Sequence, residues 1–233
     1  NHYHMTTTTA QAANVLSHLE YYLQIVWPEL KVNVLSTTEQ WAGAALSGPK
    51  SRDLLAKLFH DLDVSNEALP FMGYTEGNLF GIKAKIFRIS FSGELAYEIN
   101  VESNYGLFMW EKIMEIGKEF NIQPYGTEAL SFLRIEMGHV AGPELDGRTI
   151  PYDVSLEGLV SNKKDFIGKR SLQKEAFNKL DRQKLVGLVP TDKKTNIPEG
   201  SHLVMDKNAK LPNPKLGHVS SSCWSVENNN PFS

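Results

Sequence analysis

The residues of this chain best suited to chemistry are Phe91 and Glu98, which flank a glycine within the run Arg88–Asn100. Alternating apolar residues lead into Ser92-Gly-Glu94 and out of it again, a pattern typical of two strands joined by a glycine turn. An aromatic ring stacks on a flat heterocycle, and a neighbouring carboxylate accepts hydrogen bonds from the ring N–H groups of such a ligand. An ordinary hairpin with Glu98 on its solvated face gives the same pattern, and the pattern alone favours that interpretation.

The elements around this hairpin mix helices and strands without strict alternation. Apolar residues recur at helical spacing or in short alternating runs, and glycine or proline residues separate the segments. We expect helices over 10–27, 52–62, 105–120, 127–137 and 169–180, and strands over 31–36, 40–46, 184–189, 202–205 and 218–221, with the hairpin region at 74–101. This order predicts an α+β fold rather than a doubly wound sheet.

Composition restricts the classes of partner. The chain has 233 residues, 41% of them hydrophobic, which allows one sizeable core or two smaller ones. Its net charge is −3 and it has no long basic run, so we expect no nucleic-acid partner. No apolar stretch reaches the roughly 20 residues of a membrane span, so we expect no membrane partner. The single cysteine, Cys223, favours a cytoplasmic protein and a plain buried side chain.

Two common kinds of cofactor site are not expected in this chain. A dinucleotide site needs a Gly-x-Gly-x-x-Gly loop after a strand, and no such loop occurs. His2 and His4 would share one face of a strand, a spacing that arises by chance more often than from metal binding. We therefore expect neither a dinucleotide nor a metal ion to be held by these residues.

Several motifs recur in the order typical of one known family. The segment Ser90-Phe-Ser-Gly-Glu-Leu-Ala-Tyr-Glu-Ile99 resembles the Gly-Tyr-Thr-Gly-Glu-x-Gly-Tyr/Phe-Glu-Ile signature of the glycine-cleavage T-protein family, the folate-dependent aminomethyltransferases. Matching segments before and after it span nearly the whole chain. They are Gly48-Pro-Lys-Ser-Arg52, Pro124-Tyr-Gly-Thr127, Leu133-Arg-Ile-Glu-Met-Gly138, Lys164-Asp-Phe-Ile-Gly-Lys169, Leu185-Val-Gly-Leu188 and Gly217-His-Val-Ser-Ser221.

Within this family, the segments Thr6–Thr9, Asp63–Asn66, Phe87–Glu94 and Glu119–Glu128 resemble the C-terminal part of sarcosine oxidase alpha subunits. The resemblance implies an enzyme part, a tetrahydrofolate-binding module of a heteromeric sarcosine oxidase. Such a module would capture the one-carbon unit released by sarcosine oxidation as 5,10-methylenetetrahydrofolate. It also implies flavin-bearing partner subunits, with flavin and NAD bound on other parts of the complex.

The resemblance assigns roles to particular residues. Glu98 takes the position of the carboxylate that reads the pterin, and Phe91 that of a tyrosine that packs against the ligand. His139 follows a helix at a glycine, where relatives carry a residue that lines the pocket. Thr8 belongs to a run of threonines of which alternate members should face the ligand. Tyr97 precedes Glu98 on its strand and is therefore expected to point into the core.

Three departures from the family pattern bear on the activity. Val15 stands where the T-protein has an acidic residue, and Leu130 where the family has an arginine. A valine can neither accept a proton nor stabilise a cation, so both changes argue against T-protein activity on an aminomethyl-lipoyl arm. Gly158 replaces a tryptophan. A stand-alone aminomethyltransferase or methyltransferase stays open as an alternative, as does a folate-binding domain without catalytic activity.

Arg134 and Glu136 flank Ile135 on one expected helix and match the Leu-Arg-Leu-Glu segment of the family. We interpret both charges as structural, because a helix buried on one face is commonly anchored through such groups.

The resemblance also implies the domain organisation. We expect an aminomethyltransferase-like folate-binding α+β domain over 1–180, followed by a small β-barrel domain over 181–233. The family's domains begin earlier and end later than this sequence. The first domain is therefore expected to lack its N-terminal part and the barrel to be incomplete, as in a piece of a longer polypeptide.

Overall fold

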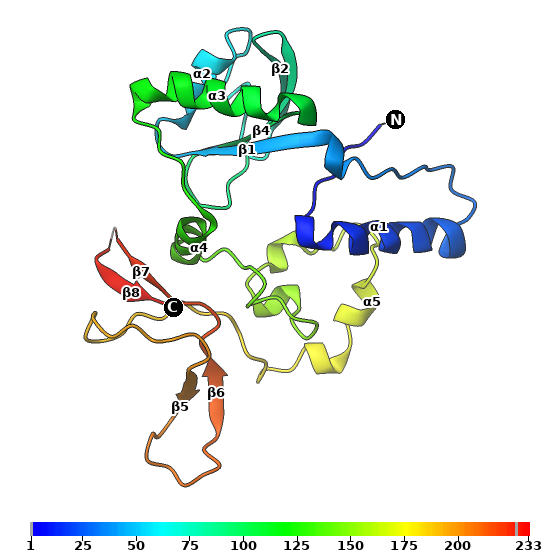
Figure 1. The fold of residues 1–233 in the computed structure, drawn as a ribbon. Coiled ribbons are helices and arrows are strands. Elements are labelled where there is room, and N and C mark those ends of the chain that lie inside the picture. The colour runs from blue at the N-terminus through cyan, green and yellow to red at the C-terminus, as the bar shows by residue number, and fades with distance from the viewer. Residues whose placement is uncertain (1, 227) are drawn as a thin grey trace. The chain divides into compact units, whose positions relative to one another are not determined.

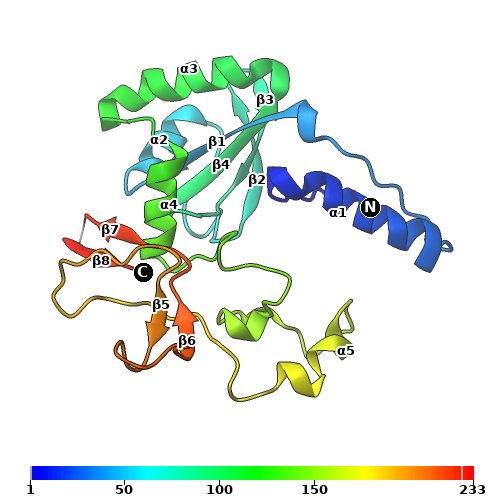
Figure 2. The same ribbon diagram turned by 60° about the horizontal axis from the view of Figure 1, so that its bottom comes forward.

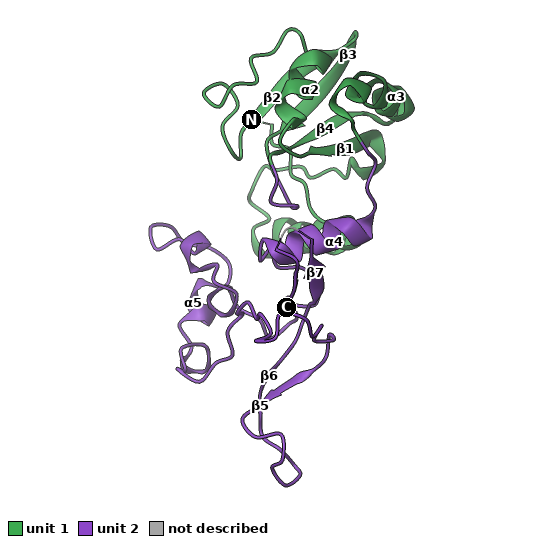
Figure 3. Cartoon of the chain, turned by 90° about the vertical axis from the view of Figure 1, so that its left-hand side faces the viewer, with its two compact units in different colours: residues 1–89, 95–122 green, residues 90–94, 123–233 purple. Residues whose placement is uncertain are grey.

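The computed structural model describes residues 2–226 and 228–233, and the chain divides into two compact units. Unit 1 comprises residues 1–89 and 95–122, and unit 2 comprises residues 90–94 and 123–233 (Figure 3). The loop 90–94 thus belongs to unit 2, although the strands on either side of it belong to unit 1. The predicted boundary near Asp181 separates a folate-binding domain from a barrel domain, and it does not coincide with the division into these two compact units. It stays a prediction.

Unit 1 is built on one antiparallel sheet with the strand order β1-β4-β3-β2 (Figure 1). The strands are β1 (Trp41–Ser47), β2 (Tyr74–Leu79), β3 (Ile82–Phe87) and β4 (Ala96–Glu102). Helices α2 (Ser51–Leu58) and α3 (Gly106–Gly117) belong to the same unit. Helices and an antiparallel sheet without regular alternation confirm the predicted α+β class.

The core of unit 1 lies between the sheet and helices α2 and α3 (Figure 2). Tyr97, Ile99 and Val101 alternate along β4 and are all 0% exposed, since successive side chains of a strand point to opposite faces. They pack with Leu55 of α2 and Ile113 of α3. The predicted burial of Tyr97 is confirmed, and Glu98 therefore lies on the other face of the sheet.

The prediction that strands extend up to the glycine turn at Ser92-Gly-Glu94 is wrong for the first strand. The strands do pair antiparallel, with Phe87 opposite Glu98, but β3 ends at Phe87 and β4 begins at Ala96. Beyond β3, Arg88 still pairs with the residues that precede β2, since its N–H donates to Gly73 O at 2.9 Å and its carbonyl accepts from Met72 N–H at 2.9 Å. The residues between are therefore a loop, and Phe91 is not on a strand.

The N-terminal part of unit 1 is largely helical, as predicted. A short 3-10 turn (Thr9–Gln11) leads into α1 (Ala12–Tyr21), and a π-helical turn (Tyr22–Val26) ends just before Pro28. The strand expected over 31–36 is wrong, because this segment has only local turn bonds such as Val32 N–H to Leu30 O. Among the residues that the structure describes, no helix is long and apolar enough to cross a membrane.

Unit 2 holds the helices α4 (Thr127–Glu136) and α5 (Lys169–Leu172) and four short strands. The strands form two separate antiparallel pairs. They are β5 (His202–Val204) with β6 (Lys215–His218), and β7 (Cys223–Ser225) with β8 (Asn230–Phe232).

Several sequence predictions in unit 2 are partly wrong. The helix expected over 169–180 ends at Leu172, and the strand expected over 218–221 lies earlier as β6. The segment 184–189 is not a regular strand, although Leu188 and Ser233 exchange backbone hydrogen bonds at 2.7 and 3.1 Å. Closure of these strands into a barrel stays a prediction.

Candidate functional site

Glu98 lies in the middle of β4, on the face of the sheet opposite to the one that packs against α2 and α3. Its cross-strand neighbours are Phe87 on β3 and Ala45 on β1. The side chain is half-buried, and burial raises the pKa of its carboxyl above the usual range. A half-buried carboxylate with apolar neighbours on both sides is costly unless it receives hydrogen bonds, so Glu98 is suited to accept them from a ligand.

Aromatic and amide groups surround Glu98 on the same face. The rings of Phe87 and Tyr74 lie 5.0 Å apart between centroids. Asn100, two residues along β4, faces Gly43, where an added Cβ would lie 2.7 Å from the Asn100 Oδ1. The amide nitrogen of Asn100 is buried and finds no hydrogen-bond partner within the described part of the chain. Gly43 thus provides the space that Asn100 occupies.

Phe91 and His139 are brought together in unit 2. Their rings stack with centroids 6.0 Å apart and an interplanar angle of 25°. Phe91 is 46% exposed, and His139 is also exposed. The pair therefore presents accessible aromatic surface on which a flat ligand ring could stack.

Thr8 lies in unit 1, directly before the 3-10 turn Thr9–Gln11. Its carbonyl accepts a hydrogen bond from Gln11 N–H at 3.0 Å, whereas its hydroxyl makes no capping bond to a described residue. The side chain is exposed. The structure thus places Glu98 and Thr8 on separate elements of unit 1 and gives Thr8 no contact that favours its assignment.

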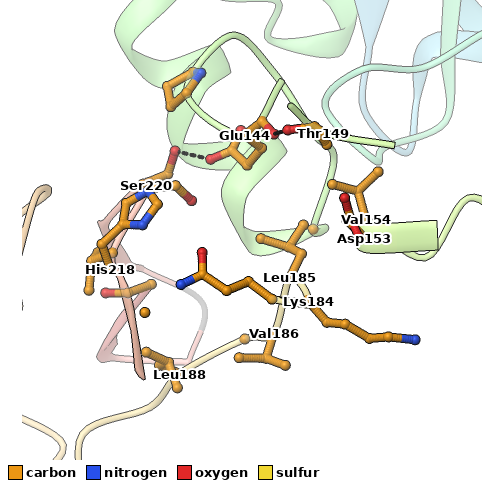
Figure 4. Close-up of a pocket in the computed structure, with 18 of the residues that line it drawn as sticks. Glu144, Thr149, Asp153, Val154, Lys184, Leu185, Val186, Leu188, His218 and Ser220 are labelled. Carbon is orange, nitrogen blue, oxygen red and sulfur yellow. Dashed lines mark hydrogen bonds between the residues drawn. The ribbon is translucent and has the colours of Figure 1, made fainter. Parts of the chain in front are cut away.

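A cavity of about 870 Å³ lies within unit 2 (Figure 4). Leu185, Val186 and Leu188 supply apolar lining from the extended segment after Arg182. His218 and other polar residues line it as well. Its size falls in the range of small-molecule pockets, but its lining does not indicate one class of ligand.

A buried ion pair lies beside this cavity. The Arg134 guanidinium donates to the Glu144 carboxylate at 2.8 Å, and the two side chains are only 6% and 4% exposed. The prediction that Arg134 is structural is therefore supported by its burial. Its partner Glu144 was missed, because no sequence pattern links a helix residue to a carboxylate across an irregular loop.

Cys223 on β7 is buried and contacts the Phe132 carbonyl of α4 at 3.9 Å, as expected for a plain buried side chain. Burial raises the pKa of its thiol. Within residues 2–226 and 228–233, no group of three or more His, Cys, Asp or Glu side chains is arranged to hold a metal ion.

The candidate residues of each unit have their own chemistry, Glu98 in unit 1 and the Phe91–His139 pair in unit 2. Glu98 accepts hydrogen bonds, and Phe91 with His139 offers a stacking surface. Sequence reasoning missed Phe87, which lies directly opposite Glu98. Its position on this face depends on the pairing register of the two strands, which the sequence pattern does not specify across an irregular loop.

Comparison with known proteins places these features in context. The model of the GCVT N-terminal domain matches residues 1–164. The sarcosine oxidase subunit alpha of Rhizobium meliloti (strain 1021) is 45% identical over 228 residues, which cover 97% of the chain and 23% of that protein. The corresponding subunit of Corynebacterium sp. (strain U-96) is 49% identical over 202 residues, or 86% of the chain and 21% of that protein. The chain thus spans less than a quarter of the length of these curated relatives.

Among solved structures, the glycine cleavage system aminomethyltransferase T from Bartonella henselae superposes with a TM-score of 0.75 at 23% identity. The match covers 95% of the chain and 56% of that structure. It confirms the predicted aminomethyltransferase-like fold.

Proposed function

Because the chain belongs to the glycine-cleavage T-protein family through its GCVT N-terminal domain, we propose that it is the tetrahydrofolate-binding module of a heteromeric sarcosine oxidase. The extensive similarity to sarcosine oxidase alpha subunits supports this choice within the family. In this role the chain holds tetrahydrofolate while the carbon from sarcosine oxidation is transferred to it. The product is 5,10-methylenetetrahydrofolate.

The observation that carries the proposal is the environment of Glu98. Its carboxylate is half-buried on the sheet, and that burial raises its pKa. The amino-pyrimidine edge of a pterin presents N–H donors that such a carboxylate accepts, so the ligand would offset the cost of burial. Phe91, stacked on His139, is assigned to contact the flat ring of the ligand.

The chemistry requires little more from these residues than binding and orientation. Sarcosine loses one hydride, and with it two electrons, to a flavin on a partner, which leaves its methyl carbon electrophilic as an iminium or, after hydrolysis, as formaldehyde. The amines of tetrahydrofolate are nucleophilic already, and their attack on this carbon with loss of water or glycine closes the product ring. Holding the reactants together contributes about 7–11 kcal/mol in favourable cases, so no covalent protein nucleophile is needed.

The same proposal includes the rest of the complex. Flavin-bearing subunits are the partners, and flavin and NAD bind outside this chain. A cytoplasmic location is part of the proposal and rests on the single, buried Cys223.

Calorimetric titration of the chain with tetrahydrofolate tests the proposal. We expect saturable binding that Glu98→Gln weakens at least tenfold, because hydrogen bonds to a charged acceptor contribute about 1.5–3 kcal/mol. Glu102→Gln is the matched control, since it makes the same change at an exposed position on the same strand. Absence of binding by the unmodified chain, or equal loss in both variants, would contradict the assignment.

A stand-alone aminomethyltransferase is the alternative. Val15 on α1 and Leu130 on α4 weigh against it, because neither side chain can take part in proton transfer. The test is turnover of an aminomethyl-lipoyl substrate with tetrahydrofolate, which the proposal expects to be absent.

A further inference from the structure

The C-terminal end of α4 fixes the backbone of His139. Gly138 adopts a left-handed conformation with φ of 71°, and its N–H donates to Ile135 O at 3.0 Å. The N–H of His139 donates to Arg134 O at 2.9 Å. These two bonds form the Schellman motif that ends many helices, with glycine at the position that requires a positive φ.

The side chain of Arg134 holds the same residue from its other side. Its Nη1 donates to the carbonyl of His139 at 3.4 Å and to Glu144 Oε2 at 2.8 Å, and its Nη2 donates to Ser221 Oγ at 2.7 Å. Arg134 therefore bonds both the N–H and the C=O of His139. Because the planar guanidinium has its donors in a rigid arrangement, these bonds define the position of the His139 backbone.

Glu144 and Ser221 in turn fix Arg134. The Ser221 hydroxyl donates to one oxygen of Glu144, and the N–H of Ala141 donates to the other at 2.8 Å. Burial acts to raise the pKa of Glu144, but these hydrogen bonds and the Arg134 charge outweigh it and hold the pKa below the usual range. The network thus joins α4, the segment after His139, and Ser221 in the loop after β6.

We propose that Arg134, Glu144 and Ser221 are positioning residues that set the place of His139 and, through its stacking contact, of the Phe91 ring. This inference rests on the proposed folate function, for which Phe91 supplies stacking surface. Gly93 supports it, since the loop that carries Phe91 packs directly on Met137 at the same end of α4. The network acts at a distance from the ligand and is required for the geometry of the aromatic pair.

The test is a double-mutant cycle between Ser221 and His139. Ser221→Ala is preferred to changes of Arg134 or Glu144, because removing one member of a buried ion pair leaves an unpaired charge and can prevent folding. Ser221→Ala removes two hydrogen bonds of the network, and we expect it alone to weaken tetrahydrofolate binding about three- to tenfold. In a His139→Ala background, Ser221→Ala should not weaken binding further, because the imidazole ring that the network positions is already absent.

Ser222→Ala is the matched control. It makes the identical change at the neighbouring residue. The Ser222 hydroxyl donates to Asn196 Oδ1 at 2.9 Å, and in the described structure it makes no hydrogen bond to Arg134 or Glu144. We expect it to lower the melting temperature without changing the dissociation constant more than about twofold.

The results of these titrations distinguish a failure of this inference from a failure of the proposed folate function. If the unmodified chain binds no tetrahydrofolate, the proposed function fails and the inference fails with it. If the chain binds and Glu98→Gln abolishes binding, but Ser221→Ala lowers only the melting temperature, the network is merely structural and the inference alone is overturned. The inference alone is also overturned if the double variant loses affinity by the product of the two single losses, because Ser221 and His139 would then act independently.

Discussion

Gly93 and Met137 approach each other so closely in unit 2 that no side chain fits between them. A Cβ added at Gly93 would lie 1.9 Å from Met137 Cγ and 2.6 Å from its sulfur. Gly93 also has a φ of 84°, which residues with a Cβ rarely adopt. The glycine of the sequence signature is therefore required for a loop-to-helix contact and not for a tight hairpin turn.

We expect Gly93→Ala to destabilise the chain by about 2–5 kcal/mol, the sum of overpacking and of a left-handed alanine. Adding Met137→Ala should recover the steric part only. Gly81→Ala is the control, because Gly81 has a φ of 95° but open space around it. Urea unfolding gives the free energy of unfolding of the unmodified chain and of the three variants. Equal losses of stability for Gly93→Ala and Gly81→Ala would contradict a steric role of the Gly93–Met137 contact.

Glu98→Gln should stabilise the ligand-free chain at pH 7. The folded-state pKa of Glu98 is raised above 4.5, so the folded protein holds this proton more tightly than the unfolded chain does. Its contribution is therefore favourable at acid pH and is lost as the pH rises through the folded pKa. A neutral amide avoids this loss. We expect a higher melting temperature for the variant at pH 7 and a difference that disappears below about pH 4. A lower melting temperature at pH 7 would refute this account.

Tyr97→Phe should be neutral or stabilising by about 1 kcal/mol. The Tyr97 hydroxyl is buried and has no hydrogen-bond partner in the described part of the chain, so its removal ends a desolvation cost. Ile99→Val, on the same strand face, should instead cost about 1 kcal/mol through lost packing. Chemical denaturation measures the free energy of unfolding of both variants. A loss above about 1 kcal/mol for Tyr97→Phe would indicate an interaction of the hydroxyl.

The Glu144–Arg134 pair should make the chain sensitive to acid. The pKa of Glu144 is held below 4.5, so its stabilising effect is complete above that value and is lost as the pH falls through the folded pKa. Glu144→Gln should cost about 3–5 kcal/mol at pH 7, because it leaves Arg134 buried without its counter-charge. We expect this difference in unfolding free energy to shrink between pH 5 and pH 3. A constant difference over that range would show that charge is not the cause.

The sequence by itself determined the α+β class, most helices of unit 1 and the alternation of β4. Apolar residues at positions 97, 99 and 101 can be buried on one face only, so Glu98 had to point away from them. The family signature supplied the remaining site residues as positions along the chain. Local pattern is sufficient for such features because strand and helix periodicity are set by the backbone.

Only the tertiary structure decided which residues meet. The signature predicts a glycine turn between two strands, yet β3 ends at Phe87 and the loop 90–94 belongs to unit 2, where Gly93 packs on Met137. The stacking of Phe91 on His139 and the pairing of Arg134 with Glu144 follow from that path. Such contacts join irregular segments that have no period, so a sequence pattern cannot predict them.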